Sequence, residues 1–178
     1  IFEELLNKVM PAVNGPRWVF FDFADPAKRR REDTAKALDL MSRFQQHANV
    51  IFGMNLREAI QIGDVLGVAP CQETPAAIAA HATRIRYKLG VHTVVIHPTA
   101  FAAAADANDT TAVDGPFVEK PKITTGAGDY FNAGFCAGRM LGAPLGVSLQ
   151  IGVATSGYYV RTAKSPSIED LVSFLRSL

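Results

Sequence analysis

Residues 124–129, Thr-Thr-Gly-Ala-Gly-Asp, stand directly before an amphipathic-helix pattern at residues 130–135. Two glycines let the backbone turn tightly, and the neighbouring amides would then point to one spot at the positive end of the helix dipole. Such a spot binds phosphate. Because Asp129 would repel an anion, its position indicates another role, namely accepting a proton from a hydroxyl that attacks phosphorus.

The same six residues also fit a plain structural turn, with Asp129 as a favourable first-turn charge of the helix. Short glycine motifs are weak signals by themselves. Two better-known phosphate loops are excluded. No Lys follows the glycines as a P-loop requires, and Phe131 stands where a dinucleotide fingerprint needs a third small residue.

The sequence on either side of this turn alternates between strand and helix patterns. Buried strands are predicted at residues 17–23, 49–54 and 92–97 and helices at 31–48, 55–66 and 75–89. This order favours an α/β fold with parallel strands and right-handed crossovers. Residues 99–105 and 110–117 predict a hairpin, and three more helices are predicted at 130–141, at 144–161 and from residue 168.

Composition narrows the classes of partner. The chain has 178 residues, 18 Lys plus Arg and 17 Asp plus Glu, so its net charge of +1 does not favour nucleic acid. Residues 28–31 are basic but precede two acids, which is typical of a solvated helix start. The uncharged residues 140–160 contain Pro144, which favours buried helix over a membrane span. Cys71 and Cys136 form no CxxC pair, so we expect a reducing, cytoplasmic location.

Residues 120–135 resemble the C-terminal signature of the PfkB, or ribokinase-like, carbohydrate kinases. Residues 22–26, Asp-Phe-Ala-Asp-Pro, and 55–58, Asn-Leu-Arg-Glu, are similar to two upstream motifs of that family, and residues 152–157 and 165–168 resemble its nucleotide pocket. The resemblance implies a ribokinase-like fold, Rossmann-type, with a mainly parallel sheet flanked by helices. It implies that residues 1–178 are the C-terminal nucleotide-binding portion, with the N-terminal half and lid missing from this chain.

The resemblance also implies an ATP-dependent phosphotransferase that needs Mg2+ and acts on a hydroxyl of a sugar or sugar derivative. A homodimer formed through the missing lid is a further expectation. The site residues that it implies are Asp129 as the catalytic base; Gly126, Ala127 and Gly128 as the anion hole; Thr99, Thr125, Val153 and Gly157 for the nucleotide; and Asn55 and Glu58 for the metal.

Several alternatives stay open. Asn55 and Glu58 also fit a helix capping box that needs no metal. The chain departs from the family pattern at Ile123, where Asp is common, at residues 97–102, which lack the usual glycines, and at Val153, where many members have Asn. A non-catalytic nucleotide- or metabolite-binding module and a Rossmann-type oxidoreductase are the two competing classes. The retained Asp129 argues against the first, and the absent dinucleotide fingerprint argues against the second.

Overall fold

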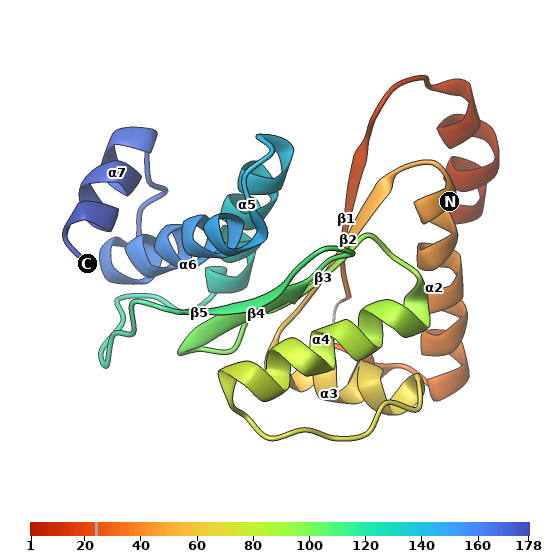
Figure 1. Ribbon diagram of the computed structural model, residues 1–178, viewed down its shortest axis with the longest axis horizontal. Helices are drawn as coiled ribbons and strands as arrows, with labels where there is room; N and C mark the ends of the chain where they lie inside the picture. Colours follow the sequence, from red (N-terminus) through yellow and green to blue (C-terminus); the bar gives the residue numbers. More distant parts are fainter. Residues whose placement is uncertain (24) are drawn as a thin grey trace.

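A five-stranded sheet lies at the centre of the computed structural model, which describes residues 1–23 and 25–178 (Figure 1). Its strands follow one another across the sheet in chain order. They are β1 (Trp18–Asp22), β2 (Asn49–Met54), β3 (Thr93–Ile96), β4 (Phe101–Ala105) and β5 (Thr110–Asp114). The pairs β1–β2 and β2–β3 are parallel, whereas β3–β4 and β4–β5 are antiparallel. Only β4 among these strands therefore runs against the others, which confirms the mainly parallel sheet and the hairpin.

One helical layer covers the first face of the sheet with α2 (Arg31–Arg43), α3 (Leu56–Val65) and α4 (Pro75–Leu89) (Figure 1). A short helical segment, residues 2–12, packs at its edge. The predicted helix over residues 31–48 ends early, because α2 gives way to a 3₁₀ turn at Phe44–Gln46. There the Phe44 side chain is fully buried and packs against the rings of Phe2 and of Phe21 in β1.

The second layer consists of α5 (Ala127–Met140) and α6 (Leu145–Thr162), which cross the other face of the sheet. Glycines bring the two helices into close contact. A Cβ on Gly134 would lie 2.4 Å from Thr155 Oγ1, and one on Gly138 would lie 2.9 Å from Ser148 Cα. The fully buried Ala102–Ala105 run of β4 allows helices on both faces to approach the sheet closely.

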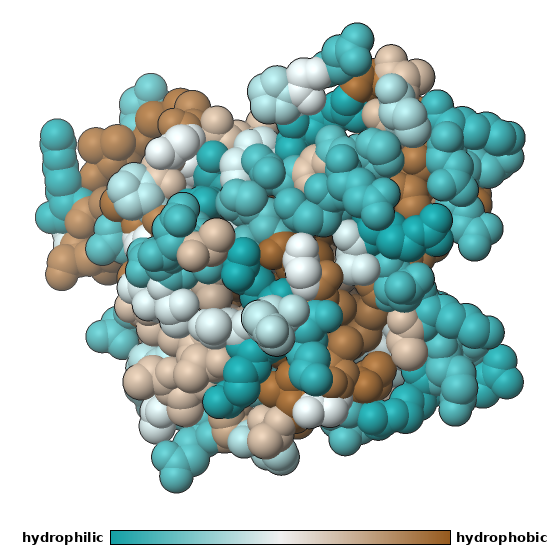
Figure 2. All heavy atoms as spheres, turned by 45° about the vertical axis from the view of Figure 1, so that its right-hand side comes forward, coloured by the Kyte–Doolittle hydropathy of each residue, from teal (hydrophilic) through white to brown (hydrophobic). Residues whose placement is uncertain are grey.

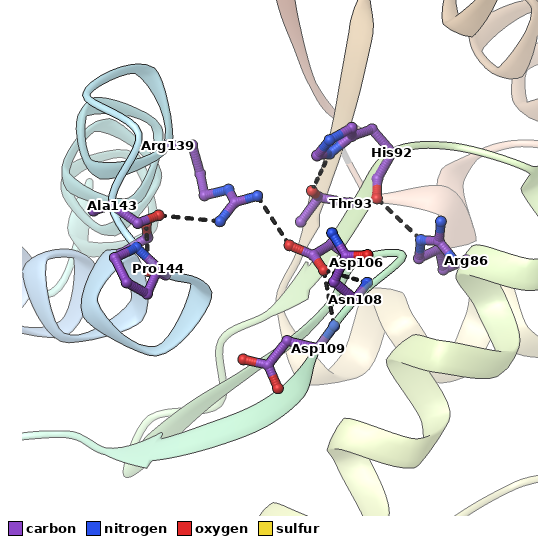
Figure 3. Close-up of polar contacts among 10 residues, drawn as sticks. Arg86, His92, Thr93, Asp106, Asn108, Asp109, Arg139, Ala143 and Pro144 are labelled. Carbon is purple, nitrogen blue, oxygen red and sulfur yellow. Dashed lines mark hydrogen bonds and ion pairs between the residues drawn. The ribbon is translucent and has the colours of Figure 1, made fainter.

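A buried ion pair ties the far end of α5 to the turn between β4 and β5 (Figure 3). Arg139 donates to the Asp106 carboxylate at 2.9 Å, and both side chains are almost wholly buried. The Asp106 carboxylate also accepts the backbone N–H groups of Asn108 and Asp109. The guanidinium of Arg139 lies 5.8 Å from the ring centroid of Trp18. These contacts fix the position of α5, whose other end carries the 124–129 turn.

The final helix α7 (Ile168–Arg176) packs on α6 but keeps an apolar stripe exposed. Ile168, Val172 and Leu175 belong to this stripe, and Figure 2 shows apolar atoms gathered at the side of the molecule where α7 lies. No helix within residues 1–23 and 25–178 combines the length and apolar character needed to cross a membrane.

Candidate active site

The 124–129 turn forms the start of α5. Gly126 is the N-cap residue with φ of 87°, a left-handed conformation that glycine adopts without strain. The Ala127 amide donates to the Thr124 carbonyl at 3.1 Å, and this bond closes the turn. Ala127 was predicted as an anion-hole donor, but in this conformation its N–H is already engaged. An anion at this helix end would therefore rely first on the neighbouring glycine amides.

Helix α6 holds the turn in place from the side. The Ser156 hydroxyl donates to the Ala127 carbonyl at 3.0 Å, and the Tyr159 hydroxyl donates to the Thr125 carbonyl at 3.1 Å. The Tyr159 ring also stacks on Tyr130, with centroids 3.8 Å apart. The backbone of the turn is thus braced before any ligand arrives.

A cavity of about 380 Å³ opens beside the turn. Six of the predicted site residues line it: Asn55, Thr99, Ala127, Gly128, Val153 and Gly157. They come from both helical layers and from the β3–β4 loop, so the fold brings together residues that are far apart in the sequence. The other predicted residues do not line this cavity, and these are Glu58, Thr125, Gly126 and Asp129.

Part of the cavity lining is apolar. Phe117 and Val160 line it beside Val153. Gly157 is required here, because a Cβ on it would lie 2.4 Å from the ring of Pro116. An apolar wall of this kind suits a nucleobase or another planar group.

Asp129 lies exposed in the first turn of α5, one residue beyond Gly128, which lines the cavity. Asp22, at the carboxyl end of β1, approaches it closely enough that the two charges interact. Partial burial raises the pKa of Asp22, the Asp129 charge raises it further, and a hydrogen bond from Asn132 Nδ2 at 2.9 Å lowers it. Asp22 and Asn132 were not among the predicted site residues, although Asp22 begins one of the quoted motifs. The signal for Asp22 was a carboxylate at the carboxyl end of a predicted strand, whereas no sequence signal pointed to Asn132.

Asn55 and Glu58 form the capping box that was the open alternative. The Asn55 side chain accepts the Glu58 amide, and the Glu58 carboxylate accepts the Asn55 amide, both at 2.9 Å. Partial burial is the main factor that raises the pKa of Glu58, and the nearby charges of Asp22 and Asp25 add to it, while the bonds to Asn55 lower it. Each residue thus has a demonstrated structural function, and a metal role is an additional prediction.

The carboxylates near Asn55 are the type of ligand that Mg2+ prefers. Among the residues that the structure describes, no three His, Cys, Asp or Glu side chains form a protein cage for a metal. Mg2+ rarely uses such a cage, because it keeps several waters and takes one or two carboxylates together with substrate phosphates. The charges of Asp22 and Asp25 help to raise the pKa of Glu58, and Asn55 engages one oxygen of that carboxylate; this group of acids fits a hydrated cation.

His97 also lines the cavity and was noted in the sequence only as part of the loop that lacks glycines. It follows β3 directly, and its amide donates to the Met54 carbonyl at 3.0 Å, next to Asn55. Its ring packs on Phe131 with centroids 4.8 Å apart. Burial lowers the pKa of His97 to about 4, so the ring is neutral at pH 7.

Comparisons with known proteins agree with this architecture. The chain is 28% identical to a ketohexokinase of Haloferax volcanii over 174 residues, which is 96% of this chain and 44% of that protein. It therefore spans less than half the length of this relative.

Two solved structures share the fold. Ribokinase of Thermotoga maritima matches with a TM-score of 0.65 and 20% identity, over 98% of this chain and 53% of that one. A putative ribokinase II of Escherichia coli, solved in complex with ATP and Mg2+, matches with a TM-score of 0.57 and 24% identity, over 84% of this chain and 46% of that one. These matches confirm the expected ribokinase-like fold. Because the family model for prokaryotic ketohexokinase matches residues 1–178, the chain belongs to that family.

Proposed function

We propose that this chain supplies the phosphate-binding and catalytic portion of an ATP-dependent carbohydrate kinase. The observation that carries the proposal is the braced Gly126–Gly128 turn beside a cavity of about 380 Å³, with Asp129 exposed one residue further along α5. The acceptor is a hydroxyl of a sugar or sugar derivative. The relative named ketohexokinase makes a ketohexose the first acceptor to test.

In the proposed reaction the chain's own groups bind, orient and move one proton. The amides at the start of α5 hold the terminal phosphoryl group, since the helix dipole favours negative charge there. Asp129 takes the proton of the acceptor hydroxyl while its oxygen forms the new bond to phosphorus, and ADP leaves. The apolar wall beside Val153 and Gly157 holds the base, with Thr99 and Thr125 nearer the phosphates.

Asn55 and Glu58, with Asp22 beside them, would hold Mg2+ through its waters. When bound, the ion offsets charge on the phosphate oxygens. The neighbour solved with ATP and Mg2+ supports this choice of donor and ion. Residues 1–178 form the nucleotide-binding portion in this proposal, and the rest of the acceptor site, the lid and a homodimer contact through the lid belong to other parts of the protein. A cytoplasmic location goes with this role, and the free thiols of Cys71 and Cys136 accord with it.

The experiment is an Asp129→Asn substitution in the full-length protein, with Asp39→Asn on the exposed outer side of α2 as its control. Loss of a general base should lower kcat about 10²- to 10⁴-fold, with the dissociation constant for ATP nearly unchanged. A coupled assay of ADP release over a panel of sugars measures kcat, and calorimetry measures the dissociation constant for ATP. If Asp129→Asn keeps the kcat of the control, Asp129 is not the base. If no sugar in the panel causes the wild-type protein to release ADP, and the protein binds no ATP, the proposed function fails as a whole.

A further inference from the structure

We propose that His97 is a phosphate-binding residue, donating its Nε2–H to an oxygen of the nucleotide's phosphate chain at the start of α5. The inference rests on the proposed function and extends it to a residue that the family pattern does not supply. Here the loop after β3 is His-Pro-Thr-Ala-Phe-Ala, residues 97–102, without the glycines whose amides approach phosphate closely. A side-chain donor in this loop would replace the contact.

The position of the ring supports the role. Its Cε1–Nε2 edge faces the first turn of α5, because a Cβ on Gly128 would lie 3.3 Å from Cε1 and 3.9 Å from Nε2. Gly128 therefore leaves the space through which this edge meets the helix end. The ring also lines the same cavity as Asn55 and Thr99. His97 thus stands between the predicted metal residues and the predicted anion hole.

The ring's surroundings hold it ready to donate. Phe131 packs on one side and is almost fully buried, and the backbone bond from His97 to Met54 fixes where the side chain starts. Within the described residues, no hydrogen bond joins the ring nitrogens to another residue; the ring's polar interactions are with the backbone of His97 itself and with the charge of Asp129, and both raise its pKa against the larger effect of burial. A neutral imidazole has one N–H and can take either tautomer, so Nε2 can carry the proton without adding a buried charge. Its depressed pKa agrees with a neutral donor.

The competing explanation is that His97 only fills space between β3 and α5. The two explanations differ in what happens when the N–H is removed and the ring is kept. His97→Phe preserves a flat ring against Phe131 but has no donor. If His97 only packs, this change should alter the affinities for ATP and adenosine equally, or alter neither. If His97 donates a hydrogen bond to phosphate, the change should weaken the binding of ATP and leave the binding of adenosine unchanged.

The test measures dissociation constants of ATP and adenosine by calorimetry on the full-length protein. We expect His97→Phe to weaken ATP binding about 10- to 100-fold, the usual value of a hydrogen bond to a charged group, and to leave adenosine binding unchanged. An unchanged affinity for ATP overturns the proposal, as does an equal loss for the two ligands. Wild-type protein that fails to bind ATP overturns the proposed function instead, which keeps the two failures distinct.

A second pair of variants keeps the test decisive if His97→Phe does not fold. His97→Gln and His97→Met have nearly the same length and flexibility, but only Gln carries an N–H donor. The Gln variant should bind ATP about tenfold more tightly than the Met variant, with equal affinities for adenosine. Equal ATP affinities in the two variants would show that the donor is irrelevant.

Discussion

Replacing Gly134 by Ala should force α5 and α6 apart. The added Cβ would lie 2.4 Å from Thr155 Oγ1 and 2.9 Å from the Ile151 carbonyl oxygen. Ordinary contact begins near 3.4 Å, so the α6 backbone must retreat by about 0.5 Å at this point. The Thr155 hydroxyl must also give up its 2.7 Å bond to Ile151, because Cβ takes its place.

The size of the effect follows from three contributions. Overpacking costs roughly 1–3 kcal/mol and the lost hydrogen bond about 1 kcal/mol, whereas Ala gains about 1 kcal/mol over Gly in a helix. The net expectation for Gly134→Ala is a loss of about 1–3 kcal/mol in the free energy of unfolding. Because α6 braces the 124–129 turn through Ser156 and Tyr159, ATP affinity should fall as well.

Gly146→Ala is the control, since it makes the same Gly-to-Ala change in the first turn of the facing helix α6, where no close contact results. Its Cβ would meet nothing nearer than the Thr111 methyl group at 3.9 Å. It should therefore stabilise the protein by about 0.5–1 kcal/mol. Urea unfolding of both variants, followed by circular dichroism, measures the difference. If the two variants unfold at the same urea concentration, the reasoning about the α5–α6 contact is wrong.

Three further predictions concern charged and titratable groups. Asp106→Ala leaves the buried Arg139 without its carboxylate partner and should lower the free energy of unfolding by about 3–5 kcal/mol. The double variant Asp106→Ala with Arg139→Met should recover most of this loss, and urea unfolding measures both variants. Burial lowers the pKa of His81 in the folded protein, so the unfolded chain binds a proton at this residue more readily than the folded protein does. The free energy of unfolding should therefore fall as pH drops below about 6.5, and it should depend less on pH in His81→Gln. Glu58→Gln keeps a capping partner, so stability should change by less than about 1 kcal/mol while the Mg2+ concentration for half-maximal rate rises; an unchanged Mg2+ requirement would leave Glu58 as a cap alone.

The sequence predicted most of the fold because its signals are local. Thr74 and Pro75 begin α4, and Gly90 ends it in a left-handed conformation, as their residue types predict. The alanine run at residues 102–105 was ambiguous, since alanine favours helix by propensity. It is a strand because it pairs with β3 and β5 and is buried on both faces, which no local pattern could show.

Long-range contacts explain what the sequence did not predict about the site. The turn at residues 124–129 was visible as a motif, but its bracing by Ser156 and Tyr159 depends on how α6 crosses α5. The approach of Asp22 to Asp129 joins residues more than a hundred positions apart. His97 lies in a loop that the sequence singled out only because it lacks glycines. Its packing against Gly128 and Phe131 is what indicates a role for the imidazole ring.

The glycines of α5 and α6 connect stability with the site. Glycine is a poor helix former, yet Gly134, Gly138 and Gly152 all lie inside these two helices, and any Cβ there would fall within 3.0 Å of the facing residue. The lost helix propensity is offset by the close approach that it permits, which buries Phe131 and Phe135 against the sheet. That approach also sets the distance from α6 to the 124–129 turn. The same small residues that weaken each helix alone therefore fix the backbone geometry on which the proposed phosphate binding at the start of α5 depends.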